Sequence, residues 1–392
     1  MSEWKECTIG ELCSNICSGG TPNRSNDSFY NNGNIPWLNT KEVSFNRIYQ
    51  TENFITELGL KNSAAKWIPQ NTVVVAMYGA TAGKSAIVKI PVTTNQACCN
   101  LTIDGSKADY RFVYYSLFNR YEHLASLANG GAQQNLNAGL IREFKISVPE
   151  LETQTKIADI LSSLDDKIEL NNQINRNLEE QAQAIFKSWF IDFEPFGGEM
   201  PSDWKTGSLS DIADYLNGLA MQKFRPKDDE IGLPVLKIKE LRQGFVGEDA
   251  ELCSPNIKSE YIVNDGDVIF SWSGSLLVDL WCGGKCGLNQ HLFKVTSKHY
   301  DKWFYYMWTK HHLDRFIFLA ADKATTMGHI KRDELDKAEV CIPLDSDYNK
   351  ISSAVKPLID RLIANKIENR TLSTMRDELL PKLMSSEMEL GC

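Results

Sequence analysis

The chain has 392 residues, of which 42% are hydrophobic and 24% are charged, the composition of an ordinary globular protein. This length indicates two or three domains, each large enough to bury a core. No window approaches about 18 consecutive apolar residues, which excludes a membrane span, and no apolar run of a signal peptide follows the first residues. We therefore expect a cytoplasmic protein.

The net charge is −9 and is unevenly distributed. Residues 1–150 carry 13 basic and 12 acidic side chains, whereas residues 151–200 carry 4 and 10. The overall basic charge that is typical of a solitary DNA-binding domain is missing. If the chain binds nucleic acid, we expect partner proteins to supply much of the phosphate contact.

Ten cysteines are scattered along the chain without the spacing of a disulfide framework. We expect reduced thiols, several of them buried as small hydrophobic side chains. Cys282 and Cys286 have three residues between them, and no second pair of Cys or His lies at zinc-binding spacing. The sequence therefore predicts no metal site.

The first 150 residues read as a mixed α and β domain, with strands over 73–77 and 86–90 and a helix over 110–128. The loop between the two strands, residues 79–85, ends in Gly-Lys-Ser. It has three residues between its glycines where a phosphate-binding P-loop needs four, and a strand rather than a helix follows. Two interpretations stay open: a plain hairpin turn, or a turn that brings Lys84 close to a polyanion such as DNA phosphate.

A polar loop follows the predicted helix. Gln133, Gln134 and Asn135 come directly after two glycines. Asn and Gln side chains suit bidentate contacts to adenine in the major groove, although a polar surface loop without function has the same composition.

Residues 154–189 form the segment around which the chain is organised. Apolar residues alternate at spacings of four and three, which predicts the seam of a coiled coil, with Asn171 and Asn175 at two seam positions. A buried Asn costs stability but selects the partner helix and the register. A helix of these 36 residues would be about 54 Å long.

The whole pattern occurs twice. The second seam lies 194 residues after the first, and Asn365 and Asn369 repeat the two asparagines. The preceding domain is repeated too, with strands predicted over 268–272 and 292–295 and a helix over 302–319. Asn95-Gln96 returns as Asn289-Gln290, and this identity favours a structural role such as hydrogen bonding to the glycine loop. The loop tips differ between the copies, as expected of two modules that read different sequences.

These observations predict an α+β fold in which two tandem pseudo-repeated globular domains are joined by two long helices that form an antiparallel coiled coil. The expected domains are 1–150 and 197–344, followed by helical segments 151–196 and 345–392. Two departures from the repeat are expected to matter. Pro357 predicts a late start or a kink in the second helix, and Arg376 replaces a seam Ala, so the helices would splay or its side chain would extend outward.

Candidate DNA-contacting residues come from the glycine loops, the loop tips and lysines near strand ends. They are Lys41, Thr81, Lys84, Gln133, Gln134, Asn135, Lys237, Lys239, Ser273, Ser275, Lys323, Thr325, Thr326 and His329. The predicted helix–helix seam contains Ile157, Leu161, Leu164, Ile168, Asn171, Leu178, Ile185, Leu358, Leu362, Asn365, Leu372 and Leu379.

Four helical stretches, residues 151–169, 171–175, 184–190 and 379–384, resemble the conserved regions of the specificity subunit of type I restriction-modification systems. The resemblance implies that each globular domain reads one half of a split double-stranded DNA sequence, while the helices set the spacing and dock two methyltransferase subunits. It also implies S-adenosylmethionine on those partners, adenine as the methylated base, and motor-nuclease subunits for cleavage.

We find no pattern of a catalytic triad, a metalloprotease or an adenine methyltransferase, so we expect a non-catalytic subunit without a cofactor of its own. The main alternative is a coiled-coil scaffold that binds proteins and no DNA. A nucleotide-binding enzyme at residues 79–85 is a third hypothesis, and the residue count of the loop argues against it.

Overall fold

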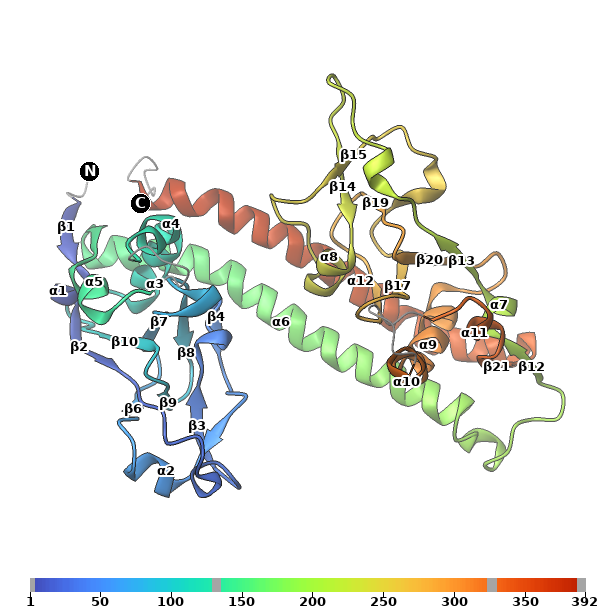
Figure 1. Ribbon diagram of the computed structural model, residues 1–392, viewed down its shortest axis with the longest axis horizontal. Helices are drawn as coiled ribbons and strands as arrows, with labels where there is room; N and C mark the ends of the chain where they lie inside the picture. Colours follow the sequence, from blue (N-terminus) through green and yellow to red (C-terminus); the bar gives the residue numbers. More distant parts are fainter. Residues whose placement is uncertain (1–3, 129–134, 323–329, 386–392) are drawn as a thin grey trace. The chain divides into compact units, whose positions relative to one another are not determined.

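The structure is a computed structural model that describes residues 4–128, 135–322 and 330–385 (Figure 1). The chain divides into two compact units. The first consists of Met1–Asp166 and Thr374–Cys392, and the second of Lys167–Ser373. Both divisions fall inside the long helices α6 (Leu151–Phe190) and α12 (Asp345–Met384), so each unit contains a piece of both helices.

The first unit contains three sheets. The first pairs β1 (Lys5–Thr8) with β11 (Lys145–Val148). The second has the order β2-β10-β7-β8-β4, with bounds Cys13–Ser18, Cys98–Ile103, Val73–Ala76, Ser85–Val88 and Asn46–Ile48. The third has the order β5-β3-β9-β6, with bounds Phe54–Ile55, Ile35–Leu38, Val92–Thr94 and Trp67–Ile68.

The helices of the first unit are short apart from the long pair. They are α1 (Ile9–Leu12), α2 (Glu57–Lys61), α3 (Tyr110–Asn119), α4 (Tyr121–Ser126) and α5 (Ala138–Glu143). The 3-10 turns are η1 (Asp27–Phe29), η2 (Thr40–Glu42) and η3 (Gly79–Thr81).

The second unit repeats this arrangement. One sheet pairs β12 (Lys205–Ser208) with β21 (Glu339–Ile342). Another has the order β13-β20-β17-β18, with bounds Asp214–Asn217, Leu292–Thr296, Val268–Ser271 and Leu277–Leu280. The last has the order β15-β14-β19-β16, with bounds Leu252–Cys253, Leu233–Leu236, Cys286–Leu288 and Ile262–Val263.

The helices of the second unit are also short. They are α7 (Leu209–Ile212), α8 (Ile238–Gln243), α9 (Lys302–His311), α10 (Leu313–Asp322) and α11 (Asp333–Asp336), with 3-10 turns η4 (Glu194–Phe196), η5 (Met221–Lys223) and η6 (Ser259–Tyr261). In this unit α8 takes the place of η2, and the 3-10 turn η6 takes the place of α2.

Strand order is therefore the same in both units, except that the first carries β4 as an additional edge strand in its largest sheet. This repetition confirms the predicted fold class. The helices predicted over 110–128 and 302–319 are each two consecutive helices, α3–α4 and α9–α10. The break falls at Arg120 in the first copy, where the backbone N–H bonds the carbonyls of Ser116 and Phe118 and closes the helix.

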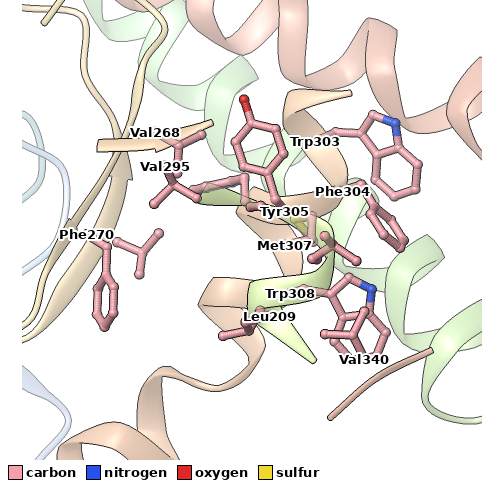
Figure 2. Close-up of a cluster of buried hydrophobic side chains, with 14 of the residues drawn as sticks. Leu209, Val268, Phe270, Val295, Trp303, Phe304, Tyr305, Met307, Trp308 and Val340 are labelled. Carbon is pink, nitrogen blue, oxygen red and sulfur yellow. The ribbon is translucent and has the colours of Figure 1, made fainter. Parts of the chain in front are cut away.

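Packing explains why α9 forms where it does. Tyr305 of α9 lies beside the sheet residues Val268 and Val295, whereas Trp303, Phe304 and Trp308 lie on the other side of the helix (Figure 2). The rings of these three residues contact Phe190 of α6, and all of them belong to one buried core. The first unit uses the same arrangement, with α3 against β7 and β8. Aromatic side chains bury large apolar areas, so they anchor the helix to the sheet.

The long helices run antiparallel. In the second unit, Asn171 of α6 donates a hydrogen bond to Asn369 of α12 (Nδ2 to Oδ1, 2.9 Å), and Asn365 donates to Asn175 (2.9 Å). The residue numbers rise on one helix while they fall on the other. None of the described helices is both long and apolar enough to cross a lipid bilayer.

Pro357 neither delays nor interrupts α12, which begins twelve residues earlier at Asp345, so the expected late start is wrong. Tertiary hydrogen bonds hold the preceding turns. Trp204 donates to Asp347 (3.0 Å) and Trp303 donates to Ser352 (2.9 Å). These contacts stabilise helical turns that a proline in isolation would disfavour.

Candidate nucleic-acid interface

A cleft of about 390 Å³ opens on the second unit. Seven of its eight lining residues are polar or charged, and the eight come from four separate segments of the chain. The lining residues are Gln222, Lys237, Ile238, Lys239, Glu251, Asn289, Gln290 and His291. Two of the predicted DNA contacts, Lys237 and Lys239, therefore lie in one concave site.

Both lysines form ion pairs in the free protein. Lys237 lies 2.6 Å from Glu251, which also contacts Arg225 at 2.8 Å, and Lys239 lies 3.0 Å from Asp249. The hydrogen bond from Lys237 holds the pKa of the Glu251 carboxyl below its ordinary value. Because solvent-exposed ion pairs contribute little stability, a phosphate oxygen can replace the carboxylate as the partner of either lysine.

The turn that carries these lysines begins with the same acidic cap in both units, although it is the 3-10 turn η2 in the first and the start of α8 in the second. Glu240 accepts a hydrogen bond from the Lys237 backbone N–H (3.2 Å), and Glu42 accepts one from Asn39 (3.0 Å). The candidate Lys41 lies on this turn in the first unit and pairs with Glu52 at 2.5 Å.

The repeated Asn-Gln pair also forms the same turn in both units. The Asn289 side-chain oxygen accepts the backbone N–H of His291 (3.1 Å), and Asn95 accepts that of Ala97 (3.1 Å). Both asparagines are 8% exposed. Their hydrogen bonds brace their own turn, and in the first unit also Asn39, rather than the glycine loop.

In the first unit, the remaining described candidates gather around the glycine loop. Thr81 donates to the Thr40 carbonyl (2.9 Å), and Lys84 donates to Ser44 (3.3 Å) while lying over the Phe45 ring. Asn135 forms a β-bridge with Tyr78 at the start of the loop. The following segment, β8, is a strand as predicted, so no helix N-terminus faces this loop as a P-loop requires.

In the glycine loop of the second unit, the two candidate serines differ in exposure and in their hydrogen bonds. Ser273 is 5% exposed, and its hydroxyl lies 3.0 Å from His291 Nδ1. Ser275 is exposed, and its carbonyl accepts a hydrogen bond from Ser271 (2.9 Å). Ser273 thus faces the cleft residue His291. The candidates Gln133, Gln134, Lys323, Thr325, Thr326 and His329 lie outside the described residues.

The predicted seam residues lie along the interface of α6 and α12 in each unit. In the first unit, Ile157 and Leu161 share a core with Leu380 and Leu383, and Leu379 packs against it. In the second unit, Leu362 is buried, and Leu178, Ile185 and Leu358 pack against the same core. Asn171 and Asn365 are at most 1% exposed. Leu164, Ile168 and Leu372 are half-buried.

Arg376 contradicts the expectation that its side chain would extend outward or splay the helices. Its guanidinium pairs with Asp165 at 2.8 Å and lies over the Phe118 ring, and the two charged side chains are only 15% and 12% exposed. Tyr115 donates a second hydrogen bond to Asp165 (2.6 Å). The Asp165 carboxylate keeps the arginine side chain inside the helix interface. Seam spacing alone does not reveal this partner.

Several residues of the cleft were missed in the sequence, namely Gln222, Glu251 and His291. His291 had a detectable signal, because it directly follows a turn that is identical in both copies and differs from its counterpart Ala97. No sequence signal marks Gln222 or Glu251 as cleft residues, since they come from unrelated positions in the chain. Within the described residues, no group of three or more His, Cys, Asp or Glu side chains could hold a metal ion, and the described cysteines are free thiols.

Comparison with known proteins identifies the family. Residues 1–180 and 201–371 each match the type I restriction modification DNA specificity domain. The chain is 28% identical to the type I restriction enzyme MjaIX specificity subunit of Methanocaldococcus jannaschii, over 99% of this chain and 97% of that protein. It is 21% identical to the HindI specificity subunit of Haemophilus influenzae, over 99% and 100%.

A solved structure supports the fold. The S subunit of a type I restriction-modification system from M. genitalium superimposes with a TM-score of 0.62 at 17% sequence identity, covering 99% of this chain and 97% of that one. With two family domains matched along one chain, each ending in the long helices described above, this protein belongs to the type I restriction-modification DNA specificity family.

Proposed function

We propose that this chain is the DNA specificity subunit of a type I restriction-modification complex, and that each globular part reads one half of a bipartite target. One observation carries the proposal. The two units share strand order, the acid-capped turn and the Asn-Gln turn, yet they carry different side chains at the positions around these turns. A constant scaffold with variable contact residues is what two readers of different half-sites require.

The paired helices set the spacing between the half-sites and dock the partners. The helix α6 carries 7 acidic and 4 basic side chains, a net charge of −3, which suits protein docking better than contact with phosphate. We expect two methyltransferase subunits, each with bound S-adenosylmethionine, and motor-nuclease subunits when the complex cleaves DNA. The specificity subunit itself contributes DNA binding rather than catalysis and acts in the cytoplasm.

Long-read mapping of methylated adenines tests this proposal. Cells would produce the chain together with the methyltransferase subunit encoded beside it, and cells with the methyltransferase alone would serve as the control. The expected result is one split motif, with two short half-sites and a fixed gap, that depends on this chain. If the soluble chain is present and no such motif appears, the chain acts instead as a protein scaffold.

A further inference from the structure

On the basis of the proposed function, we infer that His291 reads a purine edge in the half-site recognised by the second unit, and that Ser273 and Gln290 hold its ring in position. Three independent features of the cleft support this assignment: a duplicated turn, a fixed imidazole and a charged rim.

The repeated Asn-Gln turn shows which residues are structural and which residue is available to contact a base. Asn95 and Asn289 make the same hydrogen bond to the residue two positions on, so Ala97 and His291 occupy equivalent places in the two units. Ala97 is 8% exposed and has no polar side chain. His291 is half-buried and lines the cleft. The turn needs no histidine for its own geometry, because the first unit makes the same turn with alanine.

The imidazole is fixed on both nitrogen atoms. Nδ1 lies 3.0 Å from the hydroxyl of the buried Ser273, and Nε2 lies 3.3 Å from the side-chain nitrogen of Gln290. One tautomer satisfies both contacts, with Nδ1–H donating to Ser273 and Nε2 accepting from the Gln290 amide. Ser273 comes from the glycine loop and Gln290 from the repeated turn, so two separate segments orient the ring. A preoriented polar group discriminates between bases better than a mobile one.

The charge around the ring suits a DNA groove. Lys237 and Lys239 line the same cleft, and their only described acidic neighbour in that lining is Glu251, which is already paired with Lys237. When the lysines exchange their carboxylate partners for phosphates, the duplex backbone is held at the rim while base edges face the centre. His291 Nε2 then exchanges its 3.3 Å contact with Gln290 for the N6 amino group of an adenine, and the released Gln290 amide donates to N7 of the same base. Both purine atoms face the major groove.

The test compares methylation motifs of four variants in the complete complex. His291→Ala and Ser273→Ala alter the proposed reader and its anchor. Lys239→Ala removes a charge from the same cleft, and Gln96→Ala, at the counterpart of Gln290, is the control in the first unit. Adenine methylation is mapped in cells for each variant. Purified complexes are then measured against duplexes that carry single-base changes.

We expect His291→Ala to relax one base position of one half-site, with about tenfold or greater loss of discrimination there, and to leave the other half-site unchanged. Ser273→Ala should relax the same position more weakly. Lys239→Ala should weaken binding of all sequences equally, and Gln96→Ala should leave that position unaltered.

Two outcomes would overturn the assignment while leaving the proposed function intact. One is an unchanged motif in His291→Ala, and the other is equal weakening of both half-sites. His291→Gln, which preserves a polar side chain of similar size, is measured in parallel so that a folding defect of the alanine variant does not decide the result. A wild-type complex without a bipartite motif would instead refute the proposed function itself.

Discussion

Arg376 of α12 pairs with Asp165 of α6 at 2.8 Å inside the first unit, whereas the positions that correspond to them in the repeat, Ala182 and Ile359, are buried in the apolar core of the second unit. The two ends of the helical pair are thus chemically different although the sequence is duplicated. The buried charge pair disfavours antiparallel pairing of either helix with a second copy of itself, because Asp165 would then face Ala182 or Arg376 would face Ile359.

This asymmetry predicts a large stability cost for breaking the pair. Arg376→Met leaves the Asp165 carboxylate buried without its guanidinium, and we expect a loss of about 3–5 kcal/mol in the free energy of unfolding. The double variant Asp165→Leu with Arg376→Met should recover most of that loss. Urea unfolding of the full chain measures both. Lys356→Met, which removes the exposed ion pair to Asp360, is the control and should cost under about 0.5 kcal/mol.

The ion pair between Arg370 and Asp265 predicts an acid-dependent loss of stability in the second unit. Arg370 donates to both oxygens of Asp265 (2.7 and 2.8 Å) and lowers the pKa of that carboxyl below 3.8. A depressed folded-state pKa contributes stability that is present above the unfolded value and is lost as pH falls through the folded value. The contribution should therefore be present above the ordinary pKa of an aspartate and be lost progressively as the pH falls below it.

Arg370→Met should remove this pH-dependent part, which we expect to be about 1 kcal/mol because both side chains are partly solvated. The repeat offers a matched control, since Arg176, the counterpart of Arg370 in the first copy, is exposed. Arg176→Met should leave the acid limb of the stability–pH curve unchanged. The prediction would be contradicted if Arg370→Met and the wild type lost stability in the same way as the pH is lowered.

The seam asparagines are expected to reduce stability in exchange for a unique pairing. Asn171 is 0% exposed, and among the described residues its side-chain oxygen is a buried atom that accepts no hydrogen bond. Replacing Asn171 and Asn365 together by leucine should raise the thermal midpoint, because an unsatisfied polar atom costs about 1–3 kcal/mol. The same variant should form more than one assembly size in light scattering, since the register is no longer specified. A single monodisperse species would show that the asparagines do not select the pairing.

Lys84 is expected to contact DNA phosphate in the first unit. Lys84→Ala should weaken binding by about the same factor for every sequence and reduce the slope of log affinity against log salt by about 1. Lys61→Ala removes the same charge from the exposed helix α2 and should leave the slope close to that of the wild type. Fluorescence anisotropy of the purified complex on target and unrelated duplexes separates the two variants. A sequence-dependent change in Lys84→Ala would assign the lysine to base readout instead.

The duplicated design predicts that specificity can be exchanged by halves. Replacing residues 1–150 with the corresponding domain of another family member should change one half-site and leave the other intact. Methylation mapping of the chimaera is the measurement. A simultaneous change in both half-sites would show that the two recognition domains are not independent.

Sequence reasoning was successful where the information is periodic or repeated. The seam spacing located residues that bury α6 and α12 in each unit, and runs of strand-forming residues located β7, β8, β17 and β20 within one or two residues. It was less successful for helix ends, where α3–α4 and α9–α10 appear as single helices because an apolar pattern continues across the break. The interaction of Arg376 was missed because its partner is 211 residues away.

The sequence by itself determined that this protein is a duplicated α+β chain with two long paired helices, because spacing along a helix and similarity between copies are properties of the chain alone. Only the tertiary structure decided that Gln222, Lys237, Glu251 and His291 share one cleft, and that a seam arginine is retained inside by a carboxylate. Both depend on contacts between residues far apart in the chain, and such contacts are fixed by packing rather than by any local pattern.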